Sequence, residues 1–144
     1  AEEIRDMSIT RLVNGSWTSP QPIHNDNWKI AGCPVNGPRM MAKGNTVAIA
    51  WFSMPGEKSE VKVVFSQDGG ATFGQPIQID EGKAIGRVDL AMLDDLSVVV
   101  TWMEGAVIKA TRVDANGTKS NAFEVASSSE SRSSGFPQLT TSGD

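Results

Sequence analysis

Two arginines and one aspartate are the residues of this chain best suited to chemistry on an anionic ligand. Arg39 and Arg87 each lie near the start of an apolar, strand-like run. Paired guanidinium groups hold a carboxylate or a sulfate through several charge-assisted hydrogen bonds. Asp89 follows Arg87 by two residues, so in a strand both side chains point to the same face. We expect Arg39 and Arg87 to bind a ligand and Asp89 to serve as a catalytic acid/base.

Each of these assignments has a structural alternative that the sequence leaves open. An arginine at a strand end can be solvated or can pair with a carboxylate of a neighbouring unit, and Asp89 can be that carboxylate. Trp28 lies in the polar stretch 24–29. Its ring is a candidate for stacking on a sugar face, because aromatic rings present large flat apolar surfaces, but it can equally anchor the loop.

The composition argues against several classes of function. The 144 residues carry a net charge of −4 and no basic run, which argues against a nucleic-acid partner. No apolar run reaches the length of a membrane span. Cys33 is the single cysteine, so the chain has no internal disulfide, and we expect it to be buried and inert. Histidine, cysteine and acidic residues do not cluster at ligand spacing, so we expect neither metal nor cofactor.

The elements that must position these residues are strands. The runs 46–52 and 96–102 are apolar on both faces, and each has a tryptophan at or next to its end. This pattern is typical of strands packed between two layers. No segment shows a persuasive 3.6-residue apolar stripe, so the sequence predicts an all-β protein without helices.

The strands recur in a repeated unit. Gly37, Gly86 and Gly135 open similar segments at intervals of 49 residues. The strands expected in the two complete units are 38–42, 46–53, 60–66 and 74–79, then 87–92, 96–103, 106–113 and 119–125. Four short strands repeated at about fifty residues are the pattern of β-propeller blades.

The chain therefore divides as one propeller segment, 1–144, of about three blade equivalents. Residues 4–23 form a partial blade, 37–80 and 86–126 form two blades, and 135–144 begin another. Such a segment is an incomplete propeller or a piece of a longer protein. Two copies could also complete a ring, so a homo-oligomer is a further expectation.

The stretch Ser66-Gln67-Asp68-Gly69-Gly70-Ala71-Thr72-Phe73 lies between the third and fourth expected strands of the first complete unit. Aspartate and paired glycines suit a tight turn, and the oxygens of Ser66, Asp68 and Thr72 can accept its amide hydrogens. Ser66, Asp68, Gly70, Thr72 and Phe73 match the pattern Ser-x-Asp-x-Gly-x-Thr-Phe. This resembles the Asp box, or bacterial neuraminidase repeat, of sialidase-like propellers. The turns at Asn14 and Asp114 resemble it only in part.

The resemblance implies a structural turn on the outer rim of a propeller, in an extracellular or periplasmic protein. In sialidases of this kind, three arginines clamp the substrate carboxylate, a glutamate-activated tyrosine is the nucleophile and an aspartate is the acid/base. This chain contains no tyrosine. We therefore expect a non-catalytic scaffold, or a module that binds a partner or a carbohydrate such as a sialic-acid-like or other anionic glycan. The alternative is part of an exo-α-sialidase or related glycoside hydrolase.

Overall fold

The computed structural model describes residues 3–32 and 35–142, and its regular structure is almost entirely strand. Two short 3₁₀ turns, Pro55–Glu57 and Arg132–Ser134, are the exceptions in these ranges. The prediction of an all-β protein is confirmed. No helix in the described part is long and apolar enough to cross a membrane. Cys33 lies outside the described residues.

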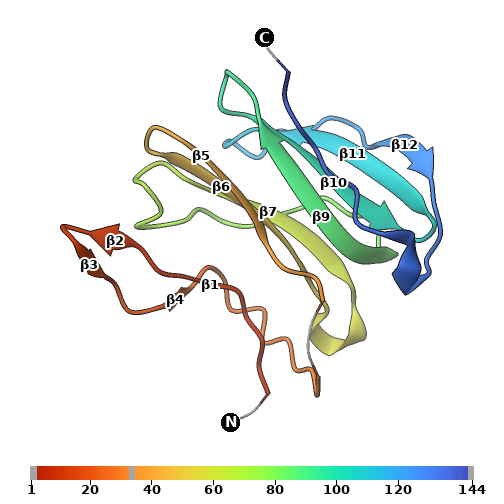
Figure 1. Ribbon diagram of the computed structural model, residues 1–144, viewed down its shortest axis with the longest axis horizontal. Coiled ribbons are helices and arrows are strands. Elements are labelled where there is room, and N and C mark those ends of the chain that lie inside the picture. The colour runs from red at the N-terminus through yellow and green to blue at the C-terminus, as the bar shows by residue number, and fades with distance from the viewer. Residues whose placement is uncertain (1–2, 33–34, 143–144) are drawn as a thin grey trace.

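Two four-stranded antiparallel sheets form the body of the molecule (Figure 1). The first contains, in sequence order, β5 (Arg39–Lys43), β6 (Thr46–Ser53), β7 (Glu60–Ser66) and β8 (Ile77–Gln78). The second contains β9 (Ala84–Met92), β10 (Val98–Glu104), β11 (Val107–Val113) and β12 (Phe123–Ser127). These are the two sets of four strands that the repeat predicted, with β8 shorter and β12 later than expected. The described chain does not close into a ring.

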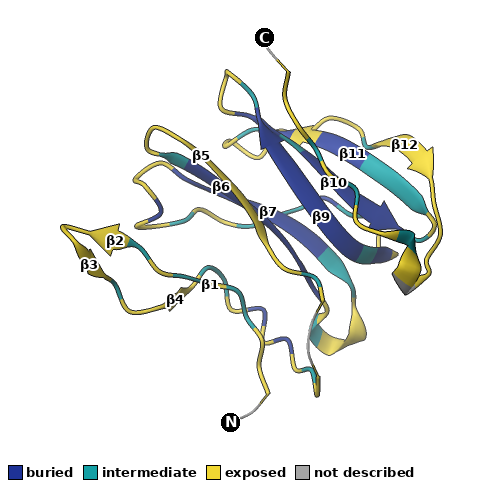
Figure 2. Ribbon diagram, in the orientation of Figure 1, coloured by how far each residue is buried: buried dark blue, intermediate teal, exposed yellow. Residues whose placement is uncertain are grey.

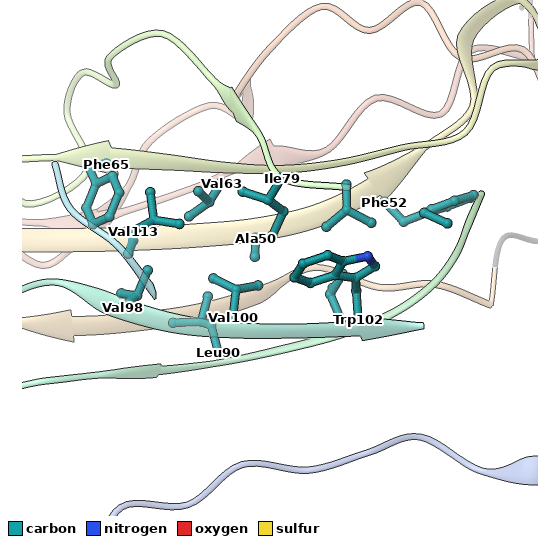
Figure 3. Close-up of a cluster of buried hydrophobic side chains, with 14 of the residues drawn as sticks. Ala50, Phe52, Val63, Phe65, Ile79, Leu90, Val98, Val100, Trp102 and Val113 are labelled. Atoms are coloured by element: carbon teal, nitrogen blue, oxygen red, sulfur yellow. The ribbon is translucent and has the colours of Figure 1, made fainter. Parts of the chain in front are cut away.

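The two sheets pack face to face around the main core. Figure 3 shows its side chains meeting between the sheets: Ala50, Phe52, Val63, Phe65, Ile79, Leu90, Val98, Val100, Trp102 and Val113. Apolar surface removed from water stabilises this contact by roughly 25 cal/mol per Å². In Figure 2 the central strands are buried, whereas β5 and β12 are exposed. Each of these exposed strands lies at one edge of its own sheet, β5 in the first and β12 in the second.

The opposite face of the first sheet is also covered, which explains why β6 is apolar on both faces. Ile49 and Trp51 pack there against Ile9 and Ile23 of the N-terminal segment. That segment contains two short antiparallel pairs, β1 (Ser8–Ile9) with β4 (Gln21–Pro22) and β2 (Leu12–Val13) with β3 (Ser16–Trp17). The residues predicted as a partial blade therefore do form strand pairs.

Residues 128–142 leave β12 and run alongside β9 (Figure 1). No strand forms over 135–142, although the repeat predicted one there. Side chains of β9 make the contacts that hold this segment: Leu139, for example, donates its amide hydrogen to the carboxylate of Asp89, and no ladder follows. Residues 143–144 of the predicted unit lie outside the described residues.

Candidate functional site

Arg39 and Asp89 come together across the two sheets, which is the pairing that the structural alternative described. Arg39 opens β5 and Asp89 lies within β9, and Nε of Arg39 is 3.7 Å from Oδ1 of Asp89. The Arg39 side chain is 44% exposed and that of Asp89 only 11%. The pair thus has one buried acceptor and one guanidinium that solvent can reach.

The Asp89 carboxylate is engaged on both of its oxygens. Oδ1 accepts the amide hydrogen of Leu90 at 3.0 Å, and Oδ2 accepts that of Leu139 at 2.6 Å. A catalytic acid/base must exchange its proton with substrate, whereas these contacts tie the carboxylate to backbone. The geometry agrees with the structural alternative, in which Asp89 is a partner of Arg39.

Arg87 is buried, with 7% of its surface exposed. Its guanidinium donates to the hydroxyl of Ser134, to the carbonyl of Gly135 at 3.0 Å and to the carbonyl of Ser131 at 2.6 Å. The centre of the guanidinium also lies 5.5 Å from the ring centroid of Phe136, a cation–π contact. A ligand could reach Arg87 only if this segment moved away. Arg39 and Arg87 therefore have separate partners, and the paired clamp stays a prediction.

A side chain that the sequence analysis did not single out positions Arg87. Asn36 donates from Nδ2 to the carbonyl of Ile85 at 3.1 Å and accepts the amide hydrogen of Arg87 on Oδ1 at 2.9 Å. Gly86 and Arg87 both have positive φ, and the register of β9 against β10 shifts here. Asn36 thus binds the backbone on both sides of Gly86, at a bulge in β9. The 49-residue spacing of Gly37 and Gly86 marked this place but could not show the contact.

Trp28 is buried, as the structural alternative had it, and the ligand contact there stays a prediction. Only 4% of the residue is exposed, and its ring meets that of Phe52 edge to face at 5.7 Å between centroids. Its backbone carbonyl accepts the amide hydrogen of Arg5, and its amide hydrogen is donated to Asp6. Trp28 anchors the loop to the core, which was the alternative.

The turn between β7 and β8 is held by its own side chains, as predicted. Oγ of Ser66 donates to Asp68 and accepts the amide hydrogen of Gly70 at 2.9 Å, while Thr72 donates both its amide hydrogen and its hydroxyl hydrogen to Asp68. Hydrogen bonds from the Thr72 side chain and backbone, and from Ser66, hold the pKa of Asp68 well below its usual range. Phe73 is half-buried against the first sheet. These five residues form a structural fastening.

The turn between β11 and β12 uses the same contact despite its different sequence. Asp114 accepts the amide hydrogen of Thr118, four residues later, at 2.9 Å, as Asp68 does from Thr72. Gly117 adopts a positive φ in this turn. The two turns therefore share one hydrogen bond, from an amide to an aspartate four residues earlier, although their sequences match only in part.

Buried carboxylates elsewhere are also structural. Asp26 accepts from Nε1 of Trp51 at 2.7 Å and from Nζ of Lys62 at 2.5 Å. Burial alone lowers the pKa of Lys62, but hydrogen bonds to Asp26 and Glu60 outweigh it and raise that pKa. The sequence analysis missed this cluster, because the residues are scattered and nothing in their spacing brings them together.

The described residues hold no group of three or more histidine, cysteine, aspartate or glutamate side chains arranged to bind a metal ion. Across the site, the sequence-predicted residues divide into one exposed cation, Arg39, and several buried groups with backbone partners. Comparison of the chain with protein-family models, with curated proteins and with solved structures found no match.

Proposed function

We propose that this chain is a segment of a sialidase-like Asp-box β-propeller with a non-catalytic role. Four observations support the propeller. Two four-stranded antiparallel sheets stack face to face in sequence order, their first strands β5 and β9 contact one another, and residues 135–142 lie beside β9 where a third first strand would run. The two aspartate-fastened turns both join a third strand to a fourth. This is the arrangement expected of consecutive blades.

The observation that carries the non-catalytic role is that Arg87 and Asp89 both bind the C-terminal segment. Arg87 donates to residues 131–135, and Asp89 accepts the amide hydrogen of Leu139. Groups that a glycosidase would direct at its substrate here hold neighbouring parts of the fold together. The chain also lacks the tyrosine that a sialidase nucleophile requires. We therefore assign the segment as a scaffold whose exposed Arg39 can contact a partner, with an anionic glycan as the favoured ligand class.

One observation favours the second candidate, part of an exo-α-sialidase or related glycoside hydrolase. Arg39 is exposed, and among the described residues it makes a single ion pair, at 3.7 Å, so its remaining donors are open to a substrate carboxylate. The residues that complete such a site would come from outside this chain, including from a second copy in a homo-oligomer.

A fluorogenic sialoside assay separates the two candidates. We expect no turnover by the 144-residue chain, and we expect binding to acidic glycans on an array that Arg39→Ala weakens. Turnover that Arg39→Ala abolishes would establish the hydrolase instead. Arg112→Ala is the matched control, because Arg112 is also exposed and also pairs with an aspartate, Asp95. Light scattering on the same samples gives the mass of the assembly.

A further inference from the structure

An open cavity of about 320 Å³ lies between the N-terminal segment, which contains β1 to β4, and the turn that contains residues 66–73, here called the Asp-box turn. Its polar lining residues are Arg11, Thr18, Ser19, Gln21 and Thr72, and its apolar lining includes Ile9, Pro22, Ile23 and Phe73. The volume is at the lower end of the roughly 300–1,000 Å³ of small-molecule sites, which suits a ligand the size of one sugar ring. It is a different place from Arg39.

Arg11 is the distinctive residue of this cavity. The side chain is half-buried, and within residues 3–32 and 35–142 its guanidinium makes no hydrogen bond, ion pair or ring contact. Arg87, which is buried, differs from Arg11, because its guanidinium donates hydrogen bonds to Ser131, Ser134 and Gly135. A guanidinium removed from part of its water and left without an acceptor favours an anion as ligand.

The Arg11 backbone and the Asp-box turn fix the position of this guanidinium. The Arg11 amide hydrogen is donated to Oγ1 of Thr18 at 3.0 Å, and the Arg11 carbonyl accepts the Thr18 amide hydrogen at 2.8 Å. Gly70 has φ +79°, and a Cβ placed on it would lie 3.5 Å from Cδ of Arg11 and 3.3 Å from Cδ1 of Ile9. The arginine stem therefore packs on the turn, and the residue lines the cavity.

The cavity is also lined by polar side chains whose hydrogen-bond donors have no partner among the described residues. Oγ1 of Thr18 accepts from Arg11 and keeps its own hydrogen free, and the side chains of Ser19 and Gln21 have no partner among the described residues. None of the lining residues that the structure describes is acidic. The half-buried ring of Phe73 adds an apolar surface of the kind on which a sugar face stacks.

We propose that this cavity binds an acidic monosaccharide unit, with the carboxylate on Arg11 and the ring hydroxyls on Thr18, Ser19 and Gln21. The site depends on the N-terminal segment and the Asp-box turn alone, so it stands apart from the proposed role of Arg39. It gives the Asp-box turn a second task besides fastening the sheet.

The test is an amide-resolved NMR titration of the 144-residue chain with methyl β-D-glucuronide, with methyl β-D-glucoside and with sodium sulfate. We expect saturable shifts at the amides of Arg11, Thr18 and Gly70. The glucuronide should produce them at a lower concentration than the glucoside or sulfate. Arg11→Met keeps the stem and removes the charge, and we expect it to weaken binding by at least about tenfold, because a charge-assisted hydrogen bond is lost. Ser19→Ala, at an exposed residue, should weaken it by about threefold while the fold is untouched.

Arg5→Met is the matched control, because Arg5 is exposed and does not line the cavity. Arg39→Ala should also leave these shifts unchanged. A negative result for this cavity is therefore distinguishable from a negative result for the proposed role of Arg39. Equal binding of the uncharged glucoside would overturn the role of Arg11. Equal affinity for sulfate would overturn the sugar assignment, and the absence of shifts at these amides would overturn the site.

Discussion

Nε1 of Trp51 donates to Oδ2 of Asp26 at 2.7 Å, which fastens the connector before the first sheet to the second strand of that sheet. Lys62 is the register partner of Trp51 on β7, and its ammonium donates to the other oxygen of Asp26. Glu60 also pairs with Lys62, at 2.7 Å. One buried carboxylate thus receives hydrogen bonds from two adjacent strands.

The second sheet repeats the tryptophan–lysine pair, but there the two side chains bind two separate acids. Trp102 and Lys109 are again register partners, and Nε1 of Trp102 donates to Oε2 of Glu104 at 2.6 Å. Lys109 pairs with Glu81, which lies in the connector before the second sheet as Asp26 lies before the first. The tryptophan–lysine pair is therefore part of the repeat, and it ties each connector to the sheet that follows it.

We predict that Asp26→Asn destabilises the protein by about 2–4 kcal/mol, because removing one member of a buried ion pair leaves the other charge poorly compensated. Asparagine keeps the shape of the side chain, so the packing around Trp51 is retained. The urea unfolding midpoint measures the change. Asp94→Asn is the control: Asp94 also pairs with a lysine, Lys43, but its side chain is 78% exposed, and we expect no measurable effect. Equal effects of the two substitutions would contradict the assigned role of Asp26.

Acid should weaken the fold through Glu60 and Asp68. Burial alone raises the pKa of Glu60, but hydrogen bonds from Lys62 and Lys58 outweigh it and lower that pKa below its ordinary 4.5. The pKa of Asp68 is also lowered, from an ordinary 3.8, chiefly by the Thr72 hydroxyl. A lowered folded-state pKa gives stability that is complete above the unfolded value and is lost as pH falls through the folded value.

We therefore expect the urea midpoint to stay constant near neutrality and to fall below about pH 4.5. Asp68→Asn should lower the midpoint at neutral pH and reduce its further fall in acid, since the group that titrates is gone. Measurement at several pH values for both proteins separates these effects. If the urea midpoint of Asp68→Asn fell in acid as much as that of the unchanged protein, the loss of stability could not be assigned to Asp68.

Much of the fold followed from the sequence, because the signal was local. The runs around Trp51 and Trp102 are apolar on both faces, and burial between two layers is what such a run requires. The 49-residue spacing then set the number of strands in each sheet. Residues 135–142 failed as a strand because a strand needs a partner ladder, and their amide and carbonyl contacts go to side chains of β9 instead.

The candidate site was harder to predict than the strands. Arg39 lies on β5, and Arg87 and Asp89 lie on β9, so all three are on the neighbouring first strands where the sequence predicted them. The sequence could not show that the segment 131–139 would occupy the donors of Arg87 and an oxygen of Asp89, because those contacts join residues 44–50 positions apart. Trp28 stood in a polar stretch, yet tertiary packing against Phe52 buried it. Long-range contacts decide which polar residues remain free.

Gly86→Ala should destabilise the protein by about 2–4 kcal/mol, because it combines a strained positive φ with overpacking. A Cβ on Gly86 would lie 2.5–2.6 Å from the side-chain atoms of Asn36. Asn36 cannot retreat without losing its hydrogen bonds to Ile85 and Arg87. Gly44→Ala is the control, since Gly44 also has a positive φ but nothing lies within 4 Å of its Cβ position. A larger fall of the urea midpoint for Gly86→Ala than for Gly44→Ala would support the contact with Asn36.

Arg87→Met should release the C-terminal segment while leaving the two sheets intact. The substitution keeps an apolar side chain at this buried position and removes the donors to Ser131, Ser134 and Gly135, together with the cation–π contact to Phe136. We expect the amide of Leu139, which is bonded to Asp89, to lose most of its protection from hydrogen exchange, because the segment that carries it is no longer held.

Amide protection in β6 and β10 should change little, since each of those strands is paired with a neighbour on both sides. Arg39→Met is the matched control: Arg39 contacts Asp89 but not the C-terminal segment, so the Leu139 amide should stay protected. Loss of protection in both variants would assign the effect to the Arg39–Asp89 pair. Retained protection in Arg87→Met would mean that Asp89 alone holds residues 131–139 against β9.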